Sequence, residues 1–176
     1  MKKQFTIGVL AAAALSTVVL AASLKFDTPA GWVPKTPSSS MRLAEFTLPK
    51  MAGDPEDATA TIYFFGGQGG SVQANLDRWI GQMAQPNGGP SKDVAKTSTF
   101  TSASGLKITF IDVSGTFVAE VTPGSAEHFN KPDFRQLAAV VETPSGPHFV
   151  KVVGPKSTLK KWEASALAFL KSLRWE

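Results

Sequence analysis

Two segments of this 176-residue chain place apolar side chains at the spacing of an α-helix, and each does so along a single stripe. The first segment follows Ser71, a suitable N-cap, and its stripe consists of Val72, Leu76, Trp79, Ile80 and Met83. Its polar face consists of Gln73, Asn75, Asp77, Arg78 and Gln82. The second segment covers about residues 157–173, with a stripe of Leu159, Trp162, Ala166, Phe169, Leu170 and Leu173. A helix with one apolar stripe buries it against another element, so each predicted helix is expected to cover one patch of a β-sheet.

The remaining sequence supplies the strands of that sheet. Segments rich in β-forming residues occur at 41–48, 59–65, 94–100, 106–113, 116–121, 134–143 and 148–153, after a short extended start at 24–26. Breaks at 101–105 and 144–147 have the composition of hairpin turns, whereas 33–40, rich in Pro and Ser, is predicted to be an irregular connection. The pattern predicts an α+β fold, in which an antiparallel sheet of about seven strands is flanked by two amphipathic helices.

The first two dozen residues indicate where the protein works. Lys2 and Lys3 precede an uncharged, apolar run at 7–22, and small residues follow at 21–23. This order is typical of a secretory signal peptide. The alternative is a retained membrane anchor, but the run is short and Ala-rich for a span, which needs about 20 strongly apolar residues. We therefore predict a signal peptide at 1–23 that is cleaved within 21–24, followed by a single globular domain at 24–176. After cleavage the protein is expected to have no stable membrane span and to lie outside the cytoplasm, either in the periplasm or secreted.

Charge and cysteine content narrow the function further. Without Lys2 and Lys3, sixteen basic residues face fourteen acidic ones, so the mature chain carries a net charge of only +2. Nucleic acid is therefore not an expected partner. The chain has no Cys, which excludes a disulfide framework and any thiol chemistry. Stability must come from apolar burial and backbone pairing.

Several segments resemble a known fold. They are the opening Phe26-Asp27-Thr28-Pro29-Ala30-Gly31-Trp32, the strand start Ser40-Met41-Arg42, the strand–glycine–helix unit that ends in Trp79, and the C-terminal amphipathic helix. Together they resemble the Mog1/PsbP-like fold and exported bacterial proteins of unknown function over most of the mature chain. The resemblance implies an α/β/α sandwich, used in that superfamily mainly to bind other proteins. PsbP proteins assist a photosynthetic membrane complex and Mog1 binds a small GTPase. Neither role carries over, because no motif residue supports the transfer.

A glycine-rich loop is the sharpest candidate site. Gly67, Gln68, Gly69, Gly70 and Ser71 lie between a predicted strand and a predicted helix N-terminus, an arrangement that can present backbone N–H groups to an anion. Neither the Walker spacing nor a complete dinucleotide fingerprint is present. The favoured alternative is structural: the glycines permit a sharp reversal into a closely packed helix. A binding role predicts that Gly69→Val abolishes ligand-dependent stabilisation without unfolding the domain.

Other constellations argue against catalysis. His128 and His148 have Glu127 and Asp133 near them in the sequence, but without the spacing of a metal site. Both histidines are predicted to be solvated loop residues. No G-x-S-x-G elbow is present. We therefore predict no catalytic residue, no metal, no cofactor and no enzymatic activity.

The tryptophans and the late basic residues suggest contact surfaces. Trp32, Trp79 and Trp162 are expected in the core, whereas Trp175 lies off the helical stripe and, with Arg174 and Lys171, is a candidate interface. Alternatively, Trp175 folds back over the sheet edge. The late basic residues are Lys151, Lys156, Lys160, Lys161, Lys171 and Arg174. They are expected on a solvated face, and this face would allow weak contact with anionic lipid.

The sequence thus predicts an exported, non-enzymatic binding or assembly module that acts on a protein partner at the bacterial envelope. The alternative is a small-ligand or anion-binding protein that uses the loop at 66–71.

Overall fold

The computed structural model describes residues 22–176 of the protein. The predicted leader, 1–23, lies almost wholly outside the described residues, so its removal stays a prediction. The elements are β1 (Leu24–Lys25), β2 (Val33–Lys35), β3 (Arg42–Leu48), β4 (Ala58–Phe64), α1 (Val72–Gly81), β5 (Met83–Ala84), a 3₁₀ turn (Ser91–Asp93), β6 (Lys96–Thr101), β7 (Lys107–Phe117), β8 (Lys131–Thr143), β9 (Gly146–Pro155), α2 (Lys156–Ser172) and β10 (Arg174–Trp175). No helix within residues 22–176 is long and apolar enough to span a bilayer.

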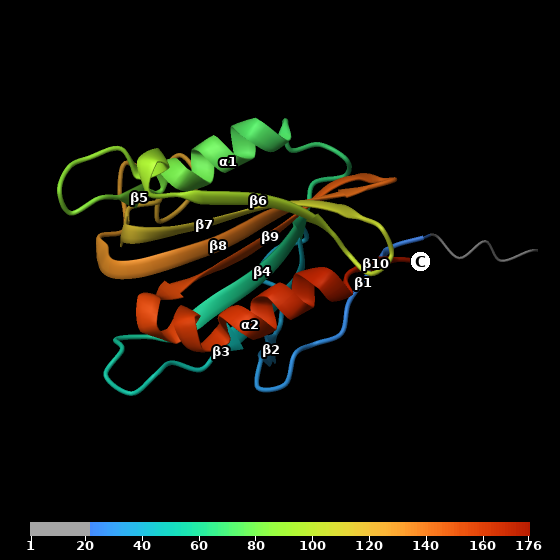
Figure 1. The fold of residues 1–176 in the computed structure, drawn as a ribbon, viewed down its shortest axis with the longest axis horizontal. Coiled ribbons are helices and arrows are strands. Elements are labelled where there is room, and N and C mark those ends of the chain that lie inside the picture. The colour runs from blue at the N-terminus through green and yellow to red at the C-terminus, as the bar shows by residue number, and fades with distance from the viewer. Residues whose placement is uncertain (1–21) are drawn as a thin grey trace, which may run out of the picture.

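Eight strands form one large antiparallel sheet (Figure 1). Its order is β2-β3-β4-β9-β8-β7-β5, and β6 also pairs with β7. The longest ladders join β7 to β8 and β8 to β9, and the β8–β9 hairpin closes at the predicted turn. β1 and β10 form a separate two-stranded sheet, in which Leu24 pairs with Trp175. The predicted α+β fold, with two helices and a large antiparallel sheet, is confirmed.

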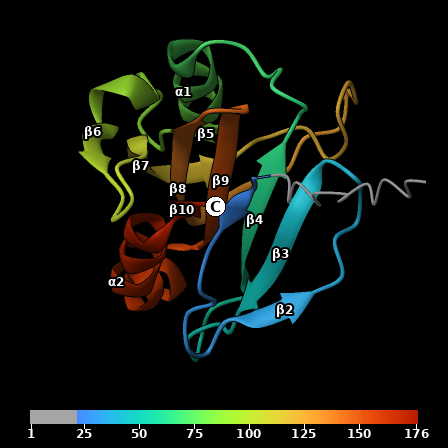
Figure 2. The same ribbon diagram turned by 90° about the vertical axis from the view of Figure 1, so that its right-hand side faces the viewer.

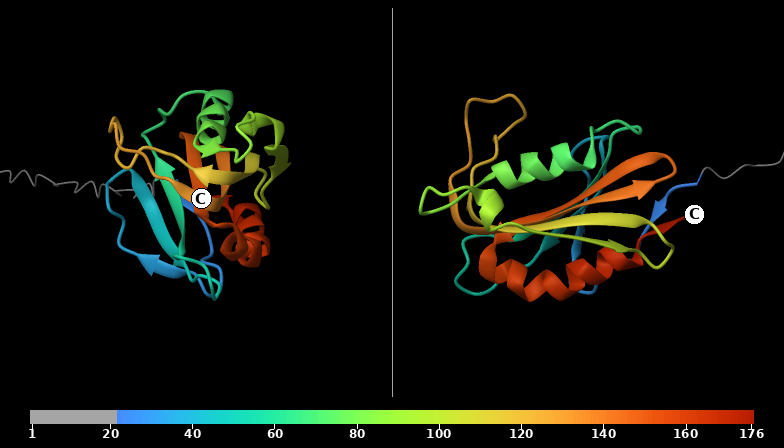
Figure 3. Two further views of the ribbon diagram at one scale, coloured as in Figure 1. Left: turned by 90° about the vertical axis from the view of Figure 1, so that its left-hand side faces the viewer. Right: turned by 45° about the horizontal axis from the view of Figure 1, so that its top comes forward.

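The two helices lie on opposite faces of the sheet (Figures 2 and 3). Phe169 of α2 belongs to one core cluster and Trp79 of α1 to the other. Side chains alternate along a strand, so β9 contributes Val150 to the α2 core and Phe149 to the α1 core. The next residue of β9, Lys151, lies on the α1 side and contacts the end of that helix.

Helix α1 begins as predicted, because Ser71 Oγ accepts a hydrogen bond from Ala74 N at 3.2 Å. The prediction that Asn75 faces water is wrong. Asn75 is only 2% exposed, since its Nδ2 donates to the carbonyl oxygens of Gly69 at 2.7 Å and Ser71 at 2.9 Å. Met83 lies beyond the helix, in β5, yet is buried in the same core as the predicted stripe.

Helix α2 is capped by the connection between β3 and β4. The Asp54 carboxylate accepts hydrogen bonds from Ser157 Oγ, Thr158 Oγ1 and, at 2.9 Å, Thr158 N. The hydrogen bonds from Ser157 and Thr158 lower the pKa of Asp54. Trp162 is half-buried and its Nε1 donates to Pro49 O at 2.9 Å. Because Asp54 and Pro49 belong to one connection, that connection fixes the start of α2 on the sheet.

Two predicted boundaries are wrong because strand pairing overrides local composition. The irregular connection predicted at 33–40 begins with strand β2, in which Pro34 is tolerated because β2 lies at the edge of the sheet. The strand predicted to continue over 116–121 ends early. Its first two residues belong to β7, which ends at Phe117 with a register shift just before that residue.

Candidate functional site

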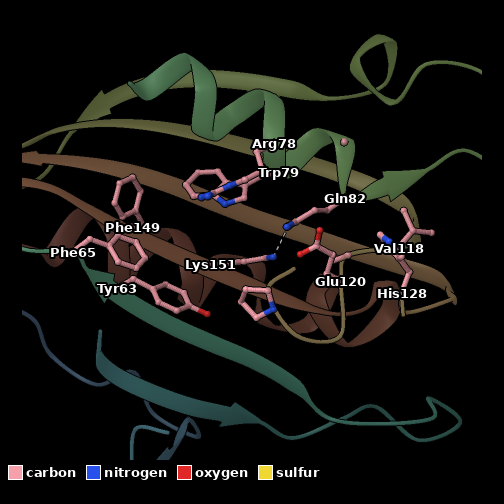
Figure 4. A pocket seen from close by; sticks show the side chains of 13 residues that line it. Tyr63, Phe65, Arg78, Trp79, Gln82, Val118, Glu120, His128, Phe149 and Lys151 are labelled. Atoms are coloured by element: carbon pink, nitrogen blue, oxygen red, sulfur yellow. Dashed lines mark hydrogen bonds between the residues drawn. The ribbon is translucent and has the colours of Figure 1, made fainter. Parts of the chain in front are cut away.

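A cleft of about 560 Å³ opens between α1 and the part of the sheet that α1 leaves uncovered (Figure 4). One wall is the end of α1, the floor is formed by β4 and β9, and the other wall is the connection between β7 and β8. The lining residues are Tyr63, Phe65, Arg78, Trp79, Gly81, Gln82, Val118, Ala119, Glu120, Pro123, His128, Phe149 and Lys151.

The wall at 118–130 is a small irregular hairpin. Glu120 forms an isolated β-bridge with His128, and the backbone N–H of Phe129 donates to Ala119 O at 2.9 Å. Glu120 Oε2 accepts a hydrogen bond from the backbone N–H of Gly124 at 2.7 Å. These contacts hold two titratable side chains, Glu120 and His128, beside the cleft.

The apolar part of the cleft is aromatic. Tyr63 and Phe65 stack with ring centroids 6.0 Å apart, and the Phe65 and Phe149 centroids are 5.5 Å apart. Trp79 meets Phe149 edge-on at 6.1 Å. Because these rings are fixed by mutual packing, they form a preformed surface for a flat apolar group.

Lys151 is the charged residue of the floor. Its Nζ donates to Gln82 Oε1 at 2.6 Å and lies 5.2 Å from the centroid of the Phe117 ring. Burial, and secondarily the positive charge of Arg78, lower the pKa of Lys151 to about 8. Within residues 22–176, Lys151 forms no ion pair. The cleft therefore holds a half-buried amine whose charge is not neutralised by any carboxylate of the described residues.

The charges around Lys151 favour an anion. Arg78 lines the same cleft, and its Nη2 donates to the neutral Asn75 Oδ1 at 2.7 Å. Glu120 is the single acidic residue among the lining side chains. Two basic groups thus face one carboxylate, next to an aromatic surface.

A second cleft, of about 450 Å³, lies on the α2 side and differs in its electrostatics. Its half-buried cation, Arg135, pairs with Asp112 at 2.7 Å and with Glu163 at 2.8 Å. Those two carboxylates neutralise the guanidinium and raise the pKa of Arg135. Lys151 of the α1 cleft thus differs from Arg135 of the second cleft, because no carboxylate of the described residues pairs with it.

The loop predicted to bind an anion is positioned by packing. Its four glycines, Gly66, Gly67, Gly69 and Gly70, all have positive φ. A Cβ at Gly69 would lie 2.6 Å from Phe149 Cζ, and one at Gly146 would lie 2.6 Å from Gly67 Cα. The glycines thus allow the loop to contact the α1 core and the β8–β9 turn.

This packing corrects one expectation about the loop. Valine at position 69 would collide with Phe149 and would require an unfavourable backbone conformation, so it cannot leave the domain unperturbed. Gln68 uses its own N–H to bond Phe65 O at 3.1 Å. An anion site formed by Gly67, Gln68, Gly69, Gly70 and Ser71 stays a prediction.

The C-terminal candidate residues lie together but differ in their contacts. Trp175 is half-buried against the α2 core and its ring centroid lies 6.0 Å from that of His148. Arg174 pairs with Asp27 at 2.9 Å, whereas Lys171 is exposed. Trp175 thus folds back on the sheet, as the alternative prediction states. An interface role for the three residues stays a prediction.

The two histidines differ in environment. His128 is exposed, as predicted, and its Nδ1 lies 2.9 Å from Val118 O. The prediction for His148 is wrong: it is 3% exposed and stacks on Phe64 with centroids 4.3 Å apart. Burial lowers the pKa of His148. Within residues 22–176, no group of three His, Cys, Asp or Glu side chains is placed to hold a metal ion.

Sequence reasoning missed the α1 cleft. Lys151 is predicted on a solvated face, whereas it is half-buried in β9. The signal was present in Phe149-Val150-Lys151-Val152-Val153, where one basic residue interrupts an apolar strand. Gln82 and Glu120 gave no such signal, because their part in the cleft depends on contacts between distant segments.

No model of a known protein family matches the chain, and a comparison with curated proteins finds no match either.

Proposed function

We propose that the protein is a binding protein for a small molecule that carries an anionic group on a flat apolar body, and that the ligand occupies the α1 cleft. The observation that carries this proposal is the half-buried Lys151 amine in the cleft, which has no carboxylate partner within residues 22–176. A half-buried cation without a counter-charge among the described residues is unfavourable. A bound anion would supply the missing charge.

The shape and composition of the cleft support the same ligand class. Its volume of about 560 Å³ falls in the range of small-molecule sites, about 300–1,000 Å³. Trp79 and Phe149 provide an apolar contact surface, while Lys151 and Arg78 provide positive charge on the same cleft. An aromatic carboxylate or phosphate matches both halves. Its binding requires no chemical turnover.

The test compares an anionic aromatic probe with its neutral amide. We expect para-toluate to raise the melting temperature of the wild type and para-toluamide to have little effect. At about one hundred times Kd, binding adds about 2.7 kcal/mol to the free energy of unfolding. Lys151→Met should abolish the response. Lys160→Met, which removes an exposed lysine of α2, is the matched control and should respond as the wild type does.

Two results would contradict this proposal. One is that neither para-toluate nor phenyl phosphate stabilises the wild type at millimolar concentration. The other is that Lys151→Met responds as strongly as the wild type, which would place the anion elsewhere, with the loop at 66–71 as the next candidate.

A second candidate function rests on a different surface. We propose that the chain has the Mog1/PsbP-like α/β/α arrangement and that the exported protein binds a protein partner at the bacterial envelope. Three apolar side chains on the β2–β3 side of the sheet support this: Val33 and Met41 are each 51% exposed and Leu43 is 45% exposed. Exposed apolar side chains beside an edge strand are a common site of protein contact.

In-cell crosslinking of the tagged full-length chain tests this second candidate. A single dominant partner is expected in the envelope fraction. Its loss in Leu43→Ser would assign the contact to the β2–β3 surface, whereas its loss in Trp175→Ala would assign it to the C-terminal residues. Recovery of uncrosslinked protein alone would refute a stable partner.

A further inference from the structure

We infer that Lys151 is a covalent site for carbonyl compounds, and that its amine forms an imine with the aldehyde or ketone group of an oxo acid bound in the α1 cleft. This inference rests on the proposed function and names the ligand class more narrowly. The carbonyl group would meet Lys151 Nζ, and the acid group would lie toward Arg78, the second basic residue of the cleft.

Imine formation first requires a neutral amine. An amine becomes a nucleophile near neutral pH when it is buried in an apolar site or placed beside another cation. Lys151 is half-buried in β9 and shares the cleft with Arg78, and burial together with the charge of Arg78 disfavours its protonated form. An ion pair with a carboxylate would have the opposite effect, and Lys151 has none within residues 22–176.

The amine must also be held in place. Gln82 Oε1, 2.6 Å from Nζ, and the Phe117 ring, with its centroid 5.2 Å away, fix the end of the Lys151 side chain. β9 is a central strand, paired on both sides by β4 and β8, so the backbone that bears the amine is rigid. In Figure 4 the Lys151 side chain extends across the cleft floor to meet Gln82.

A proton source for the departing water lines the same cleft. The nitrogen of Lys151 attacks the carbonyl carbon, and the C=O electron pair moves to the oxygen. The two hydrogens of the neutral amine and that oxygen leave as water, so the step needs no oxidant or reductant. Glu120 and His128 line the opposite wall of the same cleft, and loss of the hydroxyl group as water requires a proton donor within hydrogen-bond reach of that group.

Reductive trapping tests the inference on the wild-type protein. The probe is para-carboxybenzaldehyde with sodium cyanoborohydride at about pH 7.5, and the modified lysines are mapped by peptide mass spectrometry. At this pH the neutral fraction of an amine with a pKa of about 8 exceeds that of an ordinary lysine by roughly 200-fold. We expect Lys151 to be labelled at least about tenfold faster than the exposed Lys160 and Lys161.

Competition and one variant pair complete the test. An excess of para-toluate, which binds but cannot form an imine, should slow labelling at Lys151 and leave Lys160 unaffected. Lys151→Arg keeps the positive charge and should still bind para-toluate, yet it should lose the fast label. Lys160→Arg should keep the fast label.

Each remaining outcome decides a different point. Labelling of Lys151 at the rate of the exposed lysines would overturn the imine inference, even if para-toluate still stabilises the wild type, and anion binding would then stand alone. Fast labelling of Lys151 that para-toluate does not slow would also overturn it, because the reaction would not involve the bound ligand. Failure of para-toluate to stabilise the wild type would refute the proposed function separately.

Discussion

Replacing Lys151 by methionine should stabilise the protein near pH 7, although it removes a polar contact. The folded state lowers the pKa of Lys151 from its ordinary value of 10.5 to about 8, so folding disfavours the protonated amine. At about 1.4 kcal/mol per pH unit, this interval corresponds to about 3 kcal/mol of lost stability below pH 8. Methionine has a similar length and carries no charge, so the variant avoids this cost.

Two favourable contacts of Lys151 offset part of the gain. The hydrogen bond to Gln82 contributes about 1 kcal/mol, and the contact of the ammonium with the Phe117 ring contributes about 0.5–1 kcal/mol. The net gain in the free energy of unfolding for Lys151→Met should therefore be about 1–2 kcal/mol near pH 7.

The pH dependence separates this explanation from a simple packing effect. Between about pH 8 and 10.5 the unfolded wild type binds more protons than the folded wild type, so wild-type stability rises with pH in this interval. The advantage of Lys151→Met should accordingly fade across it. The other ionisable side chains of the cleft, Arg78, Glu120, His128 and Tyr63, are present in both proteins, so the comparison isolates the contribution of Lys151.

Urea unfolding of both proteins at a series of pH values between about 7 and 10.5 measures this difference. Two results would refute the reasoning. One is that Lys151→Met is less stable than the wild type near pH 7, and the other is that the difference in the free energy of unfolding does not change with pH. Lys160→Met, at an exposed position, should show neither effect.

Three further substitutions test the framework around the cleft. Asp54→Ala removes the cap of α2 and should lower the melting temperature near pH 7. Because the pKa of Asp54 is lowered in the folded protein, the difference in melting temperature from the wild type should shrink as the pH falls below 3.8. A difference that is unchanged in acid would contradict the capping role. Gly69→Val should destabilise the domain by about 2 kcal/mol or more, since its side chain meets Phe149; a wild-type denaturation midpoint would refute the close approach. Trp162→Ala should cost about 3 kcal/mol in chemical denaturation, the lower end for a core tryptophan, because Trp162 is half-buried and bonded to Pro49 O. A cost under about 1 kcal/mol would place Trp162 at the surface.

Features with a local cause were predictable from the sequence. The stripe of α2 depends only on residue spacing, and the hairpin turn at 144–147 depends on its own Pro, Ser and Gly. The N-cap of α1 is likewise a matter of Ser71 and the N–H of Ala74. Such features need no knowledge of the rest of the chain.

Features that arise from contacts between distant segments were not predictable in this way. Asn75 is buried because the glycine loop presents carbonyl oxygens to it, and His148 is buried because Phe64 of the neighbouring strand stacks on it. Strict alternation of side chains along β3 would place Arg42 and Glu45 on opposite faces of the sheet. The bulge after Arg42 allows Arg42 Nη1 to lie 2.8 Å from Glu45 Oε2. Each case depends on a partner that residue spacing does not identify.

The candidate site shows the same division. The loop at 66–71 could be predicted as a candidate site because its glycines lie close together in the sequence. The residues of the cleft come instead from four separate segments, β4, α1, the 118–130 connection and β9. Of the cleft residues, only Lys151 is marked by its local sequence, because it is a single basic residue in an apolar strand.

The pairing of β1 with β10 has a consequence for the order in which the chain is completed. Leu24 and Trp175 lie at opposite ends of the described sequence, yet their strands are partners. A chain that is synthesised or translocated from its N-terminus cannot form this pair until Trp175 has emerged, after every strand of the large sheet. Removal of residues 174–176 would therefore leave β1 without its partner while leaving the strands of the large sheet present.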